Sequence, residues 1–232
     1  MPVSKNRVNP SSPANAGSTG RRYGGIDSDE RQRQRKQRLI EAALAVFGEQ
    51  GFHKSTVRDV CKEAQLTSRY FYESFEGMED LFRSVYMTFS KQLMQTTVMS
   101  LAHCEPVPEK LAAAALRTFY EYIREDPRRA RVMLIDAFTV GEVMFMHTSK
   151  TNQDFAFLIM GIMDQQFPNL DKLGLDTSFI ADGLVGANNR IATQWVADKC
   201  KAPLESVLRN ALMIFDACIE YARKHNAHAA GQ

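Results

Sequence analysis

The stretch "RLIEAALAVFGEQGFHKSTVRDVCKEAQLTSRYFYESFEGMEDLF", residues 38–82, decides the fold of the N-terminal part of this chain. Its apolar residues recur at intervals of three and four positions, which is the period of an amphipathic helix. Gly51 ends the first helical segment, and the capping pattern of Thr56 and Asp59 starts a second. A third short helix of about nine residues is expected to follow Thr67. Three short helices with tight connections are typical of a helix-turn-helix DNA-binding domain.

The third helix is expected to divide its side chains between two faces. At about 100° per residue, Phe71 and Phe75 share one face, and Arg69 points away from them. Tyr70 and Tyr72 lie on the two flanks. Arginine can bond a guanine bidentately and tyrosine hydroxyls can reach phosphates, so the exposed strip is suited to DNA.

The charge distribution favours the same interpretation. Residues 1–75 contain 13 Lys or Arg and 8 Asp or Glu, whereas the remainder contains 16 and 19. The run "RQRQRKQR", residues 31–38, holds five cations and no acid. A solvated helix start and a plain surface pair between Arg69 and Glu73 are the simpler alternatives. Together with the three short helices, a phosphate-facing segment explains the pattern better.

The quoted stretch resembles the N-terminal DNA-binding region of TetR-family transcriptional regulators over roughly 45 residues. The matching motif positions end the first helix, open the second and close the third: Ala43, Phe47, Gly51, Phe52, Thr56, Val57, Arg58, Asp59, Val60, Tyr72 and Phe75. Carried over by position, the resemblance implies phosphate contacts from Thr56 and Tyr72. It implies that residues 67–70 face bases or backbone. The expected DNA-binding residues are Lys54, Thr56, Arg58, Thr67, Ser68, Arg69, Tyr70 and Tyr72.

Three positions depart from the family pattern. Met78 stands where the family usually has a lysine at the start of the fourth helix, so one phosphate contact is expected to be missing. Gln65 and Arg69 replace glycines that are common in and after the turn. Arg69 could therefore add a base contact, while Gln65 makes the geometry of the turn less predictable.

The rest of the chain also reads as helices, and we expect an all-α protein with about nine of them. Asp126-Pro127 and Asp176-Thr177 are helix starts. The expected organisation is a disordered arm over 1–29, a helix-turn-helix DNA-binding domain over 30–77, an effector-binding and dimerisation domain over 78–225, and a flexible tail over 226–232.

The resemblance implies that the larger domain binds a small effector and forms a homodimer. The expected effector-binding residues are mostly soft and apolar: Tyr120, Phe138, Met144, Met160, Met163 and Asn188. A plain hydrophobic core is the simpler interpretation of such residues. The last two helices have long apolar stripes that suit a four-helix dimer bundle. Gly183 and Gly186 would permit close helix approach, either in that bundle or within one chain.

The sequence lacks the motifs of several other classes of protein. No apolar run approaches the length of a membrane span, and the residues at the start of the sequence lack an apolar h-region, so we expect the protein not to be secreted. The four cysteines form no CxxC pair, which favours reduced thiols in a cytoplasm. No phosphate loop, HExxH or GxSxG motif is present, so we expect no enzyme activity, no cofactor and no metal site.

The predicted function is sequence-specific transcriptional regulation. We expect a dimeric repressor that binds an inverted-repeat operator in double-stranded DNA and is released by a small, largely apolar effector. Two alternatives are a helical protein-interaction module that does not bind DNA and a thiol-responsive regulator that uses Cys104 or Cys200.

Overall fold

The protein is built from helices alone in the residues that the structure, a computed structural model, describes: 23–170, 172 and 174–229. This confirms the all-α fold class. The nine described α-helices are α1 (Tyr23–Gln50), α2 (Val57–Ala64), α3 (Ser68–Tyr72), α4 (Met78–Ala102), α5 (Pro108–Glu125), α6 (Pro127–Leu134), α7 (Glu142–Gln166), α8 (Thr177–Ala197) and α9 (Leu204–Ala229). Two 3₁₀ turns are η1 (Phe52–Lys54) and η2 (Asp136–Phe138).

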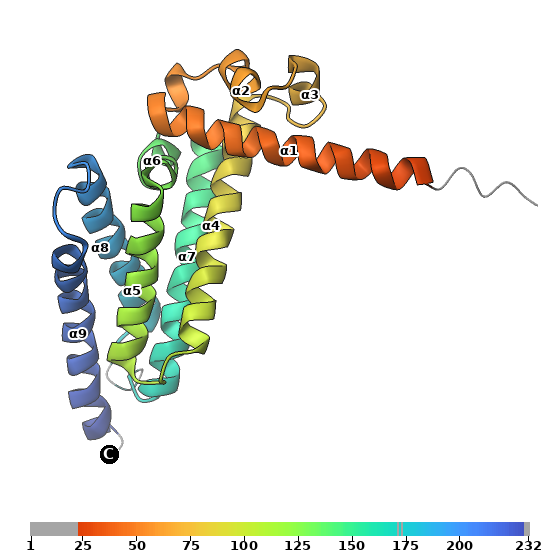
Figure 1. Cartoon of the computed structure of the whole chain (residues 1–232). Helices are drawn as coiled ribbons and strands as arrows, with labels where there is room; N and C mark the ends of the chain where they lie inside the picture. Colours follow the sequence, from red (N-terminus) through yellow and green to blue (C-terminus); the bar gives the residue numbers. More distant parts are fainter. Residues whose placement is uncertain (1–22, 171, 173, 230–232) are drawn as a thin grey trace, which may run out of the picture.

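The helices form two regions (Figure 1). α1 lies across the ends of the long helices, with α2 and α3 on its far side. The long helices α4, α5, α7, α8 and α9 extend from there to the other end of the molecule, and α6 contacts both α1 and α8. No helix among the described residues has the length and hydropathy needed to cross a bilayer.

The predicted helix starts are confirmed by their caps. Asp126 accepts a hydrogen bond from the backbone N–H of Arg128 at 3.1 Å, and Pro127 occupies the first position of α6. Asp176 accepts from the N–H of Ser178 at 2.8 Å at the start of α8. These side chains satisfy N–H groups that lack a partner within the helix.

A single buried core joins the two regions. Phe47 of α1 lies 5.3 Å from Phe82 of α4 between ring centroids, and Phe52 of η1 lies 5.1 Å from the same ring. The core continues down α4 to Leu93 and on to Trp195 of α8. α4 begins at Met78, yet its first turns pack with the DNA-binding helices, so it belongs to both regions.

Three boundaries differ from the sequence-based expectation. Residues 23–29, assigned to the disordered arm, continue α1, and residues 1–22 lie outside the described part. Directly after this extension Glu30 pairs with Arg33 at 2.8 Å, and such pairs favour helix. Residues 226–229, assigned to the tail, continue α9. α3 is shorter than the nine or so residues expected, because the Ser74 N–H donates to the Phe71 carbonyl and tightens the backbone.

The turn between α2 and α3 places Gln65 in the left-handed region, with φ 54°. Its N–H donates to the Lys62 carbonyl at 3.2 Å, and the Leu66 N–H donates to the Cys61 carbonyl at 2.9 Å. These two bonds form a Schellman cap, in which glycine is the usual left-handed residue. The glutamine therefore adopts the conformation that a glycine would adopt, at a cost in strain.

Replacing this residue tests the strain. Gln65→Gly should raise the free energy of unfolding by about 0.5–1 kcal/mol because glycine populates the left-handed region freely. Gln65→Val should lower it by more than that, since a β-branched residue resists positive φ. Chemical denaturation of both variants against the wild type measures the two effects. Equal stabilities for Gly, Gln and Val at this position would contradict the assigned turn geometry.

Candidate DNA-binding surface and ligand cavity

The third helix is held from one side and exposed on the other. Phe71 and Phe75 are buried, and their ring centroids lie 5.8 Å apart. On the opposite face the Arg69 side chain is 83% exposed, and Tyr72 is 64% exposed. This is the predicted division of the helix into an anchoring face and an open face.

Arg69 also makes the surface pair that the sequence suggested as an alternative. Its Nε lies 2.8 Å from Oε1 of Glu73. Exposed pairs of this spacing contribute only about 0.3–0.5 kcal/mol. An acceptor that forms two hydrogen bonds with the guanidinium can therefore displace Glu73.

Thr67 and Ser68 lie exposed at the N-terminal end of α3. Thr67 occupies the N-cap position in an extended conformation, but its side chain makes no capping hydrogen bond. Its hydroxyl and the first N–H groups of the helix remain available to a phosphate or a base.

Thr56 is differently occupied, because it forms a complete capping box with Asp59. The Asp59 N–H donates to the threonine hydroxyl at 3.2 Å, and the Asp59 carboxylate accepts from the Thr56 N–H at 3.0 Å and from the Thr56 hydroxyl at 2.7 Å. These bonds hold the pKa of Asp59 below its ordinary value. Lys54 and Arg58 on either side of this cap are exposed. Six of the eight predicted DNA-binding residues thus lie in η1, α2 and α3, and the other two, Thr56 and Thr67, are the N-caps of α2 and α3.

The structure adds cations that the sequence did not assign to this surface. Arg35 of α1 lies over the ring of Tyr70, with 4.5 Å between Cζ and the ring centroid. Lys36 lies over Phe75 at 5.1 Å, and Arg38 donates to the carbonyl of Ala64 at 2.7 Å. The basic run was noticed in the sequence, but only the packing of α1 against α3 shows which of its members lie beside the recognition helix.

Arg35 therefore provides a test of the electrostatic surface. Arg35→Gln keeps a polar side chain over Tyr70 and removes the charge. It should weaken binding to all DNA sequences alike and reduce the slope of log K against log salt by about 1 if one phosphate contact is lost. Fluorescence anisotropy at several salt concentrations measures the slope. Lys91→Ala, at an exposed position of α4 remote from α3, is the matched control and should leave the slope unchanged. An unaltered slope in Arg35→Gln would remove this residue from the surface.

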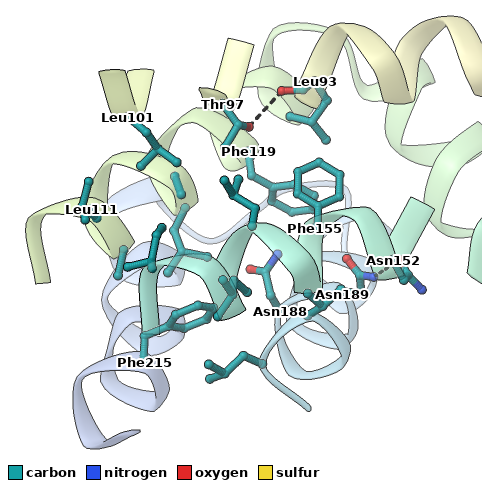
Figure 2. A pocket seen from close by; sticks show the side chains of 18 of the residues that line it. Leu93, Thr97, Leu101, Leu111, Phe119, Asn152, Phe155, Asn188, Asn189 and Phe215 are labelled. Carbon is teal, nitrogen blue, oxygen red and sulfur yellow. Dashed lines mark hydrogen bonds between the residues drawn. The ribbon is translucent and has the colours of Figure 1, made fainter. Parts of the chain in front are cut away.

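The larger domain contains a cavity of about 150 Å³ between α4, α5, α7, α8 and α9 (Figure 2), and residues of α6 and η2 also line it. None of its lining side chains carries a formal charge. Each long helix contributes leucine, isoleucine or phenylalanine side chains to the lining. Among them are Leu93, Leu101, Leu111, Phe119, Phe155, Ile162, Leu184, Phe215 and Ile219. Such a space suits an apolar ligand.

The six predicted effector-binding residues divide into two groups. Phe138, Met163 and Asn188 line the cavity. The other three, Tyr120, Met144 and Met160, are not among its lining residues. Tyr120 and Met144 belong to the main core, and Met160 packs against a separate cluster around Ala156, Ala181 and Val185.

Tyr120 is a core residue with an unusual polar atom. Its ring lies 5.8 Å from that of Trp195, and its hydroxyl is buried without a hydrogen-bond partner. Burial raises the pKa of this phenol.

Sequence reasoning missed most of the cavity wall, including a pair of asparagines. The Asn189 amide donates to Oδ1 of Asn152 at 3.1 Å, which joins α8 to α7 (Figure 2). The unusual run "ANNR", residues 187–190, was the available signal. It could not reveal its partner on α7.

α6 and η2 connect the cavity with the DNA-binding helices. Their Leu134 and Phe138 line the cavity. The Asp136 carboxylate between them accepts a hydrogen bond from the Phe52 N–H at 3.0 Å. Arg131 lies 3.7 Å from that carboxylate and donates to the carbonyl of Glu49 at 3.2 Å, at the end of α1. The short segment of α6 and η2 therefore contacts the cavity on one side and the end of α1 and η1 on the other.

The approach of α6 to α1 is close. A Cβ atom added to Gly48 would lie 2.3 Å from Cβ of Arg128. A residue larger than glycine at position 48 would force the two helices apart. Helices in such close contact are expected to move together.

Three of the four cysteines lack the environment of reactive thiols. Burial raises the pKa of Cys61, Cys200 and Cys218, which disfavours the nucleophilic thiolate. Cys218 lines the cavity. Over the described residues no three His, Cys, Asp or Glu side chains are grouped to hold a metal ion.

Comparison with known proteins agrees with this geometry. Residues 39–85 match the family model described as "Bacterial regulatory proteins, tetR family". The chain is 21% identical to the fatty acid metabolism regulator protein of Bacillus subtilis (strain 168) over 184 residues, which is 79% of this chain and 94% of that protein.

Solved structures share the fold. FadR from Bacillus subtilis, in complex with stearoyl-CoA, has a TM-score of 0.70 at 19% identity, over 77% of this chain and 96% of that one. The fatty acid degradation regulator FadR from Bacillus halodurans has a TM-score of 0.68 at 17% identity, over 78% and 93%. The family and these relatives are regulators, in agreement with the predicted function and with the absence of an enzyme motif.

Proposed function

Because residues 39–85 form the DNA-binding domain of the tetR family of bacterial regulatory proteins, we propose that this transcriptional regulator is a cytoplasmic, dimeric repressor released by a long-chain acyl ligand. The observation that carries the proposal is an uncharged cavity joined to the DNA-binding helices by the short segment of α6 and η2 and by α4.

DNA would be read by the open face of α3. Arg69 contacts a base edge in the major groove, and Tyr72 and Thr67 position the helix on phosphates. The exposure of these side chains and the burial of Phe71 and Phe75 behind them support this arrangement.

A second copy would pack on α8 and α9. Phe179 is 77% exposed on α8, and Met213 is exposed on α9. A Cβ atom at Gly183 or Gly186 would meet nothing within 4 Å, so these glycines do not serve an intramolecular helix crossing. Two such faces make a four-helix bundle with twofold symmetry, which places two α3 helices on the half-sites of an inverted repeat.

The ligand would be a long-chain acyl thioester whose apolar chain enters the cavity. The Bacillus subtilis relative of this fold was solved with stearoyl-CoA. Because no lining side chain of this cavity is charged, the cavity favours the apolar chain, and the charged head group stays at the surface. A space of about 150 Å³ holds only part of a long acyl chain, so the surrounding helices move apart when the whole chain enters.

Release from DNA would follow from the position of α6, η2 and α4. A ligand that binds better when these elements are displaced shifts the protein toward that state. Phe82 of α4 packs against the DNA-binding helices, and the bonds of Asp136 and Arg131 reach the end of α1. Their displacement changes the separation of the two α3 helices, and the dimer no longer matches its operator.

Selection of bound DNA from a random pool tests the DNA-binding half of the proposal. The selected sites should contain an inverted repeat with half-sites about one helical turn apart. Arg69→Ala should cost about 1–3 kcal/mol on the selected site and relax preference at one base pair. Tyr72→Phe should weaken binding to all sequences alike. If the purified protein shows no salt-dependent DNA binding, the interaction-module alternative is correct.

A filled cavity tests the ligand-binding half. Ala112→Phe places a ring in the lining of the cavity on α5 and should abolish release by stearoyl-CoA while operator binding without ligand stays within about threefold. The measurement is operator affinity at increasing stearoyl-CoA. Ala102→Phe, at an exposed position outside the lining, is the control and should respond like the wild type. Full release of the Ala112 variant would place the ligand elsewhere.

A further inference from the structure

The cavity contains one polar atom that the protein leaves without a partner. Asn188 lies on α8 and is only 9% exposed. Its Oδ1 atom is buried and accepts no hydrogen bond from the protein. A buried acceptor without a partner is unfavourable, and such groups in native proteins call for an explanation.

Neighbouring polar side chains of the cavity wall form hydrogen bonds within the protein. The Thr97 hydroxyl donates to the Leu93 carbonyl at 2.9 Å. The Thr148 hydroxyl donates to a carbonyl of its own helix at 2.8 Å, and Asn189 bonds Asn152. Of the buried, unpartnered side-chain atoms in the described chain, Oδ1 of Asn188 is the one that belongs to a lining residue.

Packing alone gives no reason for an amide here. Leu184, one turn before Asn188, and Ala192, one turn after it, are buried and apolar. Leucine has nearly the shape of asparagine and would continue this stripe without an unpaired acceptor. The amide therefore has a use that the protein without its ligand does not show.

We propose that Asn188 binds a hydroxyl group within the apolar chain of the ligand, so that the preferred ligand is a hydroxylated long-chain acyl thioester. This rests on the proposed function, because it names the ligand of the same cavity. A hydroxyl can donate to Oδ1 and can also accept from the amide nitrogen, so it satisfies either orientation of the side chain. A carboxylate or phosphate would have no lining cation to pair with.

The place of Asn188 in the cavity makes the hydroxyl an internal one. Figure 2 shows the amide among the lining side chains, between Phe215 and Phe155, rather than at one end. The lining residues of α4 run from Tyr86 to Leu101 near the end of that helix, and Asn188 stands midway along α8. A chain that fills the space passes the amide part of the way along its length.

The test compares stearoyl-CoA with a series of hydroxystearoyl-CoA isomers whose hydroxyl occupies successive internal carbons. Isothermal titration of the full chain measures each dissociation constant. For the wild type, at least one isomer should bind roughly fivefold or more tightly than stearoyl-CoA, as expected for one buried hydrogen bond. In Asn188→Leu that ratio should fall to about 1, and stearoyl-CoA should bind at least as tightly as before.

Thr97→Val is the matched control, since its hydroxyl lines the same cavity but is already bonded within α4. It should keep the wild-type preference. Asn188→Ala provides a second variant if the leucine variant does not fold, and should also lose the preference.

Each outcome decides a different point. Binding of stearoyl-CoA with no preference for any hydroxylated isomer overturns the role of Asn188 and leaves the proposed function standing. A preference that survives in both Asn188 variants overturns it as well. Failure of every acyl thioester to bind the wild type overturns the proposed ligand class, and the inference about Asn188 with it.

Discussion

The contact of Phe47, Phe52 and Phe82 is the constraint on which the rest of the structure depends. It joins the end of α1, the turn η1 and the first turns of α4 in one buried aromatic cluster. Burial of aromatic side chains is among the largest single contributions to a core. The DNA-binding helices are therefore part of the same packed unit as the larger domain, and a displacement of α4 cannot leave α1 and η1 in place.

Much of this fold could be predicted because it depends on residues that are close together in the sequence. The Thr56–Asp59 capping box, the Asp126 cap and the opposed faces of α3 depend on residues within one or two helical turns of one another. Helical period and cap chemistry are sufficient for such features. Phe71 and Phe75 could be identified as anchors for that reason. The resemblance of the N-terminal region to a known family supplied the expected contacts with DNA.

The cavity could not be predicted in the same way, because five long helices contribute to its wall and their relative rotation is not a local property. Tyr120 and Met144 were chosen by residue type, and packing placed both in the main core. Asn188 lines the cavity, but its missing partner became visible only with the surrounding helices in position. Arg35 is a similar case, since its neighbour Tyr70 is 35 positions away in the sequence.

The uncharged wall of the cavity has a consequence for how the protein responds to its surroundings. DNA binding neutralises phosphates and so depends steeply on ionic strength. Insertion of an apolar chain depends on dehydration of hydrocarbon, whose signature is a negative heat-capacity change rather than a salt effect. The two proposed binding events would thus be sensitive to different physical variables: a change in salt would alter the affinity for DNA, and a change in temperature would alter mainly the affinity for an apolar ligand.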